Sequence, residues 1–233
     1  MQEIQNSQYR LRKAIGFLGI GLPMVIWVTH GKLLSSISHY YYTSSSVFFI
    51  GILFSFGLTL IAYKGYPKND KKRERISDDW ITTLAGICIL ITVLIPTKCI
   101  GSGDSMICCN MDYLFGHSKD FWGRLHLFSA ATFIFLLGLM CIKKFTLSEN
   151  EENKKRNQFY KLCGYIIWSC IGLLIVLFSL EALIEKFDFN NYVWGFTFIL
   201  ESIAVWAFGI AWLIKGKFDR DIRSILHKTD KAE

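Results

Sequence analysis

The sequence predicts an all-α, polytopic membrane protein, a bundle of six transmembrane helices with the N and C termini in the cytoplasm. Of the 233 residues, 52% are hydrophobic and 15% are aromatic, and only three are proline. Six apolar segments come close to the roughly 20 residues that cross a bilayer. Backbone groups in lipid must be bonded within the chain, and the segments lack the alternation of barrel strands, so we expect helices. The segments are Ala14–Val28, Ser46–Tyr63, Trp80–Ile95, Leu125–Ile142, Tyr165–Leu183 and Tyr192–Ile214.

Positive charge alternates with these segments. Twenty-one of the 26 Lys and Arg residues lie in the N-terminal arm, in every second gap, or from the end of the last segment onward. Basic residues beside spans are retained in the cytoplasm, so this pattern predicts cytoplasmic termini and a multi-pass protein of the cell membrane, such as a bacterial inner membrane. The exceptions are Lys32, Lys98, Lys119, Arg124 and Lys186. The net charge of +7 then faces anionic membrane lipids, and no nucleic-acid partner is expected because no recognition module accompanies it.

Local signals support individual elements. Asp78 and Asp79 stand at the start of the third segment, where carboxylates favour a helix N-terminus and can cap it. In the second segment, Gly51, Ser55 and Thr59 form a ladder of small residues on one face, which lets helix backbones approach closely. We expect this ladder to serve packing within the bundle, and a homo-oligomer contact is the alternative.

The chain divides into a six-helix transmembrane domain over residues 1–216 and a cytoplasmic amphipathic tail over residues 217–233, which we expect to lie on the inner leaflet. Residues 96–123 form the longest gap, and the topology makes it an extracytoplasmic loop cap between the third and fourth spans. Its cysteines are Cys99, Cys108 and Cys109. In an oxidising compartment the first of them can form a disulfide with either of the other two.

Ionisable side chains inside a membrane are costly and therefore point to function. Glu201 lies about nine residues into the last segment, which at 1.5 Å per residue is close to the bilayer midplane. The topology places four more polar residues in the same outer half: His39, His126, Ser129 and Glu181. We therefore predict an outward-facing polar pocket or pathway, centred on Glu201, that binds a lipid or small molecule or passes ions like a channel or transporter. Such a function requires neither a catalytic residue nor a cofactor.

Two other functions use overlapping residues. A zinc-dependent membrane hydrolase of the amidase or lipase class needs about three His or carboxylate ligands, for which His39, His126 and Glu201 are the candidates. No HExxH pair is present. A membrane effector gated by an anionic ligand or partner in the cytoplasm would use basic residues of the second gap, such as Lys71 and Lys72.

Six short strings carry a resemblance to known membrane proteins: Leu11–Pro23, Ile37–Thr43, Tyr63–Tyr66, His126–Ala130, Lys155–Gly164 and Glu201–Gly216. Together they resemble a group of uncharacterised bacterial six-span membrane proteins. Their layout is distantly similar to the DRAM-like membrane family, which has six spans, an early Ile-Ser motif and a histidine that opens a later span. The resemblance implies a six-span fold and no established activity.

A second resemblance concerns three residues. Ser38, Asp79 and His126 match loosely the Ser, Asp and His of the seven-span membrane hydrolases, which include alkaline ceramidases and adiponectin-receptor-like proteins. Those hydrolases hold zinc with three His residues. The chain departs from their pattern because its last segment contains no His and a seventh span is missing.

Overall fold

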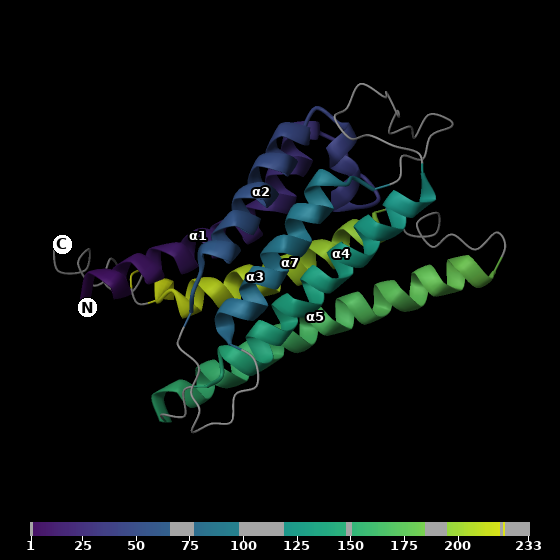
Figure 1. Cartoon of the computed structure of the whole chain (residues 1–233). Coiled ribbons are helices and arrows are strands. Elements are labelled where there is room, and N and C mark those ends of the chain that lie inside the picture. Colours follow the sequence, from purple (N-terminus) through teal and green to yellow (C-terminus); the bar gives the residue numbers. More distant parts are fainter. Residues whose placement is uncertain are drawn as a thin grey trace, which may run out of the picture.

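The computed structural model describes residues 2–65, 77–97, 119–147, 151–184, 195–219 and 221. Within these ranges the chain is helical and forms no strand, which confirms the predicted all-α class. The elements are α1 (Gln2–His30), η1 (Ile37–Tyr42), α2 (Ser46–Ala62), α3 (Asp78–Leu94), α4 (Asp120–Leu139), η3 (Met140–Lys144), α5 (Glu151–Leu183) and α7 (Phe196–Lys215), as Figure 1 shows. Here η1 is a short 3-10 helix and η3 is a π-helical turn that continues α4.

Length and composition identify a membrane protein. Within the described residues, four helices are long and apolar enough to cross a membrane. They span Asn6–His30, Asp120–Lys144, Asn153–Leu183 and Phe196–Lys215. Helices α2 and α3 contain 17 residues each, about 25 Å at 1.5 Å per residue, which is slightly less than the hydrocarbon thickness of about 30 Å.

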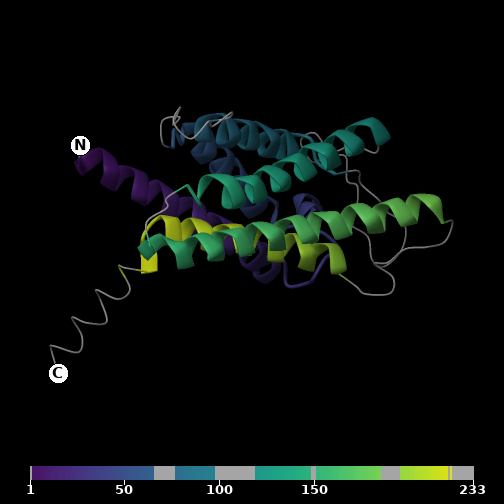
Figure 2. The same cartoon turned by 90° about the horizontal axis from the view of Figure 1, so that it is seen from below.

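Six of the helices in the described ranges form a closed ring. Each helix packs against the next in the order α1, α2, α3, α4, α5, α7, and α7 then packs against α1. Figures 1 and 2 show the resulting elongated bundle from two directions. The side chains that face the interior are mostly large and apolar, and Trp212, Phe208 and Ile26 are completely buried. The ring therefore has one continuous core, with α7 among its most buried helices.

The outer surface of the ring is apolar as well. Large apolar side chains are exposed on several helices, among them Trp27, Val47, Phe128, Ile175 and Ile210. A protein in water rarely exposes so many large apolar groups, whereas in a bilayer these groups contact lipid. This surface agrees with the four membrane-crossing helices.

Glycine allows α1 and α7 to pack closely. A Cβ atom added at Gly209 would lie 2.8 Å from the carbonyl oxygen of Gly16 and 2.9 Å from Ile20. A Cβ atom added at Gly16 would lie 2.8 Å from the carbonyl oxygen of Gly209. The two backbones meet at these positions, and no larger residue fits there without separating the helices.

The predicted small-residue ladder on α2 does not pack inside the bundle. Gly51 and Ser55 are exposed, and a Cβ atom added at Gly51 meets no atom within 4 Å. The neighbouring face of α2 packs on α3 instead, with Gly57 in contact with Ile89 and Leu90. The expectation of bundle packing is therefore wrong, because the ladder faces outward. The homo-oligomer alternative stays a prediction.

Several helix ends differ from the predicted ones. The most consequential is the start of α7, which is Phe196 and not Tyr192. Glu201 is therefore five residues into the helix, about 8 Å from its start at 1.5 Å per residue, and lies in the first third of α7 instead of near its middle. Helix α5 begins earlier than predicted, at Glu151, because its charged first turns extend past the apolar segment.

The start of the predicted tail folds back onto α1. The ring of Phe218 packs edge-on against Phe17, with ring centroids 5.2 Å apart, and Asp221 forms an ion pair with Lys13. The rest of the tail lies outside the described residues. The same is true of residues 98–118, which include Cys99, Cys108 and Cys109, and of residues 66–76, which include Lys71 and Lys72.

We expect Gly209→Val to destabilise the bundle, because its branched side chain would force α1 and α7 apart. Overpacking of this kind costs about 1–3 kcal/mol. The thermal unfolding midpoint of the protein in detergent should fall, whereas Gly51→Val on the exposed ladder should leave it nearly unchanged. Equal midpoints for the two variants would contradict the close contact of α1 with α7.

Candidate functional site

The carboxylate of Glu201 bonds to the start of η1. The Ser36 hydroxyl donates to its two oxygens at 3.1 and 2.9 Å, and the backbone N–H of Ile37 donates to Oε2 at 2.7 Å. The first N–H groups of a helix lack partners within the helix, and a negative charge beside them is favourable. In the described part of the chain, no Lys, Arg or His forms an ion pair with Glu201.

A reciprocal contact holds the start of α7. The backbone N–H of Phe198, in the first turn of α7, donates to the carbonyl oxygen of Ser35 at 2.8 Å. The residue before the helix, Gly195, has φ +73°, a conformation in which a side chain would be strained, and a Cβ atom there would lie 2.7 Å from Leu33. The segment before η1 and the start of α7 therefore satisfy each other's unpaired backbone groups.

His126 of α4 joins η1 to the end of α3. Its Nδ1 lies 2.7 Å from the carbonyl oxygen of Ile95 and 3.0 Å from that of Thr92, and its Nε2 lies 2.9 Å from the hydroxyl of Ser38. Carbonyl oxygens only accept, so Nδ1 carries the proton, and in the neutral ring Nε2 accepts from Ser38. His126 is only 3% exposed, and it caps carbonyl groups that the last turn of α3 leaves open.

His39 of η1 lies beside this contact. Its Nδ1 is 2.7 Å from the hydroxyl of Ser35. Burial, together with the nearby His126, lowers the pKa of His39 from its ordinary 6.5 to about 4. Protonation of His39 is therefore unfavourable while η1 stays docked on the bundle.

These residues form one group, which we call the serine cluster: Ser35, Ser36, Ser38, His39, His126 and Glu201. Three of the predicted site residues, His39, His126 and Glu201, thus meet at η1. Each of the three bonds a different serine. Glu181 lies near the end of α5 and takes no part in the hydrogen bonds described above. Ser129 is buried, but its hydroxyl donates to the carbonyl oxygen of Leu125 in its own helix.

Ser35 and Ser36 were not among the site residues predicted from the sequence. A signal was present, because Ser36 directly precedes η1 and serine is a preferred residue at the N-cap. The hydroxyl of Ser36 accepts from the N–H of Ser38 at 3.2 Å, as a capping serine does. Its bond to Glu201 joins residues 165 positions apart, and no local pattern predicts that.

The described residues contain no group of three His, Cys, Asp or Glu side chains able to hold a metal ion. His39, His126 and Glu201 point to separate serines instead of to one shared centre. The thiols of Cys88, Cys141, Cys163 and Cys170 are buried and free.

An aromatic layer lies between this cluster and the opposite end of the bundle. Phe56 of α2 packs edge-on against Phe133 of α4 and Phe208 of α7, with ring centroids 5.8 and 6.0 Å apart. All three side chains are buried. Phe208 is seven residues, or about 10 Å, along α7 from Glu201. The three aromatic rings fill the core of the helix bundle between Glu201 and the C-terminal end of α7.

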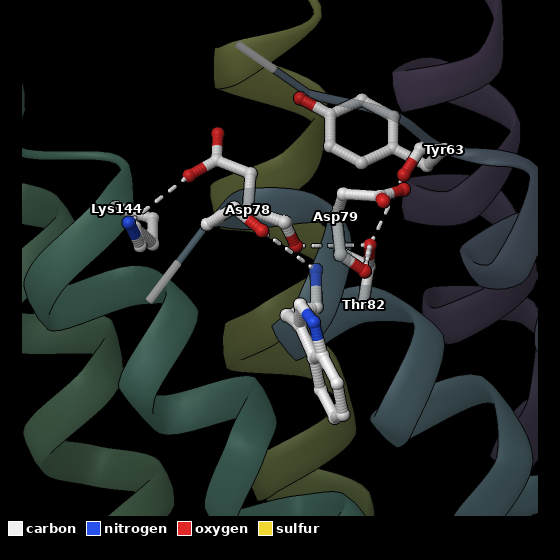
Figure 3. A network of polar contacts seen from close by, with 7 residues as sticks. Tyr63, Asp78, Asp79, Thr82 and Lys144 are labelled. Carbon is white, nitrogen blue, oxygen red and sulfur yellow. Dashed lines mark hydrogen bonds and ion pairs between the residues drawn. The ribbon is translucent and has the colours of Figure 1, made fainter. Parts of the chain in front are cut away.

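A second polar group surrounds the start of α3 (Figure 3), at the opposite end of that helix from its contact with His126. The N-cap is Ser77, whose hydroxyl accepts from the N–H of Trp80, and the hydroxyl of Thr82 donates to the carbonyl oxygen of Tyr63 at 3.1 Å. Asp78 is 5% exposed and lies 3.5 Å from Nζ of Lys144, so it forms a buried ion pair in addition to its expected place in the first turn.

No family model, curated protein or solved structure matches this chain. The resemblances to six-span membrane proteins and to seven-span hydrolases therefore stay predictions.

We expect the folded protein to lose stability as the pH falls from about 6.5 toward 4. The pKa of His39 is lower in the folded protein than in the unfolded chain, so the unfolded chain binds the proton first. The loss attributable to this residue is at most about 3 kcal/mol. His39→Gln should reduce the pH dependence of the thermal midpoint in detergent. An identical pH profile for His39→Gln and the wild type would contradict the effect of burial.

Proposed function

We propose that this chain is a six-span protein of the cell membrane, that its termini lie in the cytoplasm, and that η1 faces outward. Two observations support this proposal. The apolar helix α2 and the equally long α3 complete the ring with the four longer helices. Arg12, Lys144 and Lys215 all lie at the end opposite to η1, as the alternation of basic residues requires.

Reporter fusions test this topology. Alkaline phosphatase, which is active only outside the cytoplasm, should be active when fused after Leu183 and inactive when fused after Glu233. A fluorescent protein that folds only in the cytoplasm should give the opposite pattern. Phosphatase activity after Glu233 would contradict the proposed orientation.

We further propose that the serine cluster binds a lipid headgroup or a small polar molecule at the outer face. One observation carries this proposal: the Glu201 carboxylate lies inside a membrane-crossing helix and has only neutral donors among the described residues. A carboxylate in this setting is costly and attracts a positively charged or hydrogen-bond-donating ligand. Ser38 and His39 are partly exposed beside it and offer further polar contacts.

Binding accounts for the arrangement better than passage of ions does. A pathway needs polar groups along the length of the bundle, as in channels. Here the aromatic layer of Phe56, Phe133 and Phe208 fills the core below the cluster. We therefore expect ligands to enter and leave on the same side of the membrane.

Glu201→Gln tests this function. We expect some members of a panel of lipids and small amines to raise the thermal midpoint of the wild-type protein in detergent. Glu201→Gln should weaken the apparent affinity for those compounds about tenfold or more. The Gln side chain is uncharged, and an NH₂ donor replaces one of the two acceptor oxygens. Insertion into the membrane should be unaffected.

Glu181→Gln is the matched control, because it removes a carboxylate outside the cluster. Glu181→Gln should bind the active lipids or amines as the wild type does. Equal responses of the wild type and Glu201→Gln to every active compound would contradict the proposal. Proton or cation flux through liposomes containing the protein, if lost in Glu201→Gln, would favour a pathway instead.

A serine-dependent hydrolase is the second candidate. Ser38 donates to Nε2 of His126, and the backbone carbonyls of Ile95 and Thr92 orient the ring, so a nucleophile, a base and an orienting group are aligned. It ranks second because the N–H groups of Ser38 and His39 already bond Ser36, and so they cannot stabilise an oxyanion. Labelling of Ser38 by a fluorophosphonate probe would reverse this order.

A further inference from the structure

A cleft lies where the first turns of α5 meet the end of α7. It has a volume of about 220 Å³ and is lined by Lys155, Arg156, Phe159, Ile214 and Asp219. Helices α5 and α7 pack side by side in the bundle (Figure 2), and Asp219 follows the last turn of α7. The lining therefore combines two basic side chains, two large apolar side chains and one carboxylate.

Asp219 holds the guanidinium of Arg156 in this cleft. The Nη2 atom of Arg156 lies 2.5 Å from Oδ2 of Asp219, and both side chains are partly buried. A guanidinium carries five N–H donors, and among the described residues this contact engages only Nη2. The other N–H groups stay available to a second acceptor. Because its position is already fixed, Arg156 loses little side-chain freedom when it binds a ligand.

Lys155 supplies a second donor. Its side chain is exposed, and it takes part in no hydrogen bond or ion pair in the part of the chain that the structure describes. An ammonium group carries three N–H donors and no acceptor. Lys155 and Arg156 together can therefore hold an acidic group that has several acceptor oxygens, such as a phosphate.

The cleft lies at the depth of lipid headgroups. The membrane-crossing part of α5 runs from Asn153 to Leu183, and its 31 residues span about 46 Å at 1.5 Å per residue. This length exceeds the hydrocarbon thickness of about 30 Å. Because its first turns are basic and apolar residues follow, those first turns occupy the polar layer of the bilayer.

The exposed side of α5 changes from basic to apolar just past the cleft. Leu162 lies two helical turns beyond Lys155, and Tyr165 lies almost one turn further, so all three share one side of the helix. Leu162 and Tyr165 are each 55% exposed. Leu173 and Val176 are exposed further along the same side. A lipid with its phosphate in the cleft would therefore find apolar side chains beside its acyl chains.

We propose that this cleft binds the phosphate of an anionic phospholipid, with Lys155 and Arg156 as donors and with Phe159 and Ile214 against the glycerol backbone. The cleft is smaller than the roughly 300–1,000 Å³ of pockets that enclose a whole small ligand. A headgroup whose acyl chains stay outside fits this size. The proposal uses no residue of the serine cluster and holds for either orientation of the chain in the membrane.

The test uses the full-length protein in phosphatidylcholine nanodiscs with increasing phosphatidylglycerol. The thermal midpoint of the wild type should rise with the mole fraction of phosphatidylglycerol and then level off, because a ligand that binds the folded state stabilises it. The measured quantity is the mole fraction that gives half of this rise. Glycerol phosphate, titrated at constant ionic strength into pure phosphatidylcholine nanodiscs, carries the same phosphate without acyl chains and should give no rise.

Two variants remove the proposed donors. Lys155→Gln changes an exposed side chain and should raise the half-maximal mole fraction about fivefold, as expected for the loss of one basic contact with an anionic headgroup. Arg156→Gln should raise it about tenfold, because charge-assisted hydrogen bonds are lost. Since Arg156→Gln also loses the ion pair with Asp219, its rise is measured from its own midpoint in pure phosphatidylcholine.

Lys161→Gln is the matched control, because it makes the same change of charge at an exposed position of α5 outside the cleft. Its half-maximal mole fraction should equal that of the wild type. The proposal is overturned if phosphatidylglycerol does not stabilise the wild type, or if Lys155→Gln shifts the response no more than Lys161→Gln does. Equal stabilisation by glycerol phosphate would overturn a lipid as the ligand.

Discussion

The contact between Glu201 and the start of η1 determines the positions of the other polar groups at that end of the bundle. The carboxylate accepts from Ser36 and Ile37, and the first turn of α7 donates back to Ser35. With η1 held in this way, Ser38 reaches His126, which in turn caps the last turn of α3. One buried carboxylate therefore couples α7, η1, α4 and α3, and a ligand that engaged it would act on all four.

Lipid imposes the wider arrangement. Apolar side chains cover the outside of the ring, so polar groups are satisfied inside it or at its ends. The serine cluster and the ion pair of Asp78 with Lys144 lie at opposite ends, and Phe56, Phe133 and Phe208 lie between them. The aromatic layer therefore separates the two polar groups.

The polar groups at the two ends of the bundle differ in how their charges are balanced. At one end, hydrogen bonds from neutral groups surround the carboxylate of Glu201. At the other, Asp78 and Asp219 form ion pairs with Lys144 and Arg156. The first arrangement suits a ligand that donates hydrogen bonds or carries positive charge.

The sequence by itself determined the all-α class, the apolar helices and the membrane environment, because composition and segment length carry that information locally. It also indicated His39, His126 and Glu201, since ionisable residues beside apolar segments stand out. Only the tertiary structure decided how these three are used: each bonds a serine next to or within η1, and these bonds join distant parts of the chain. The outward direction of the Gly51 ladder and the unpaired N–H of Trp212 also depend on helix packing, which sequence periodicity leaves open.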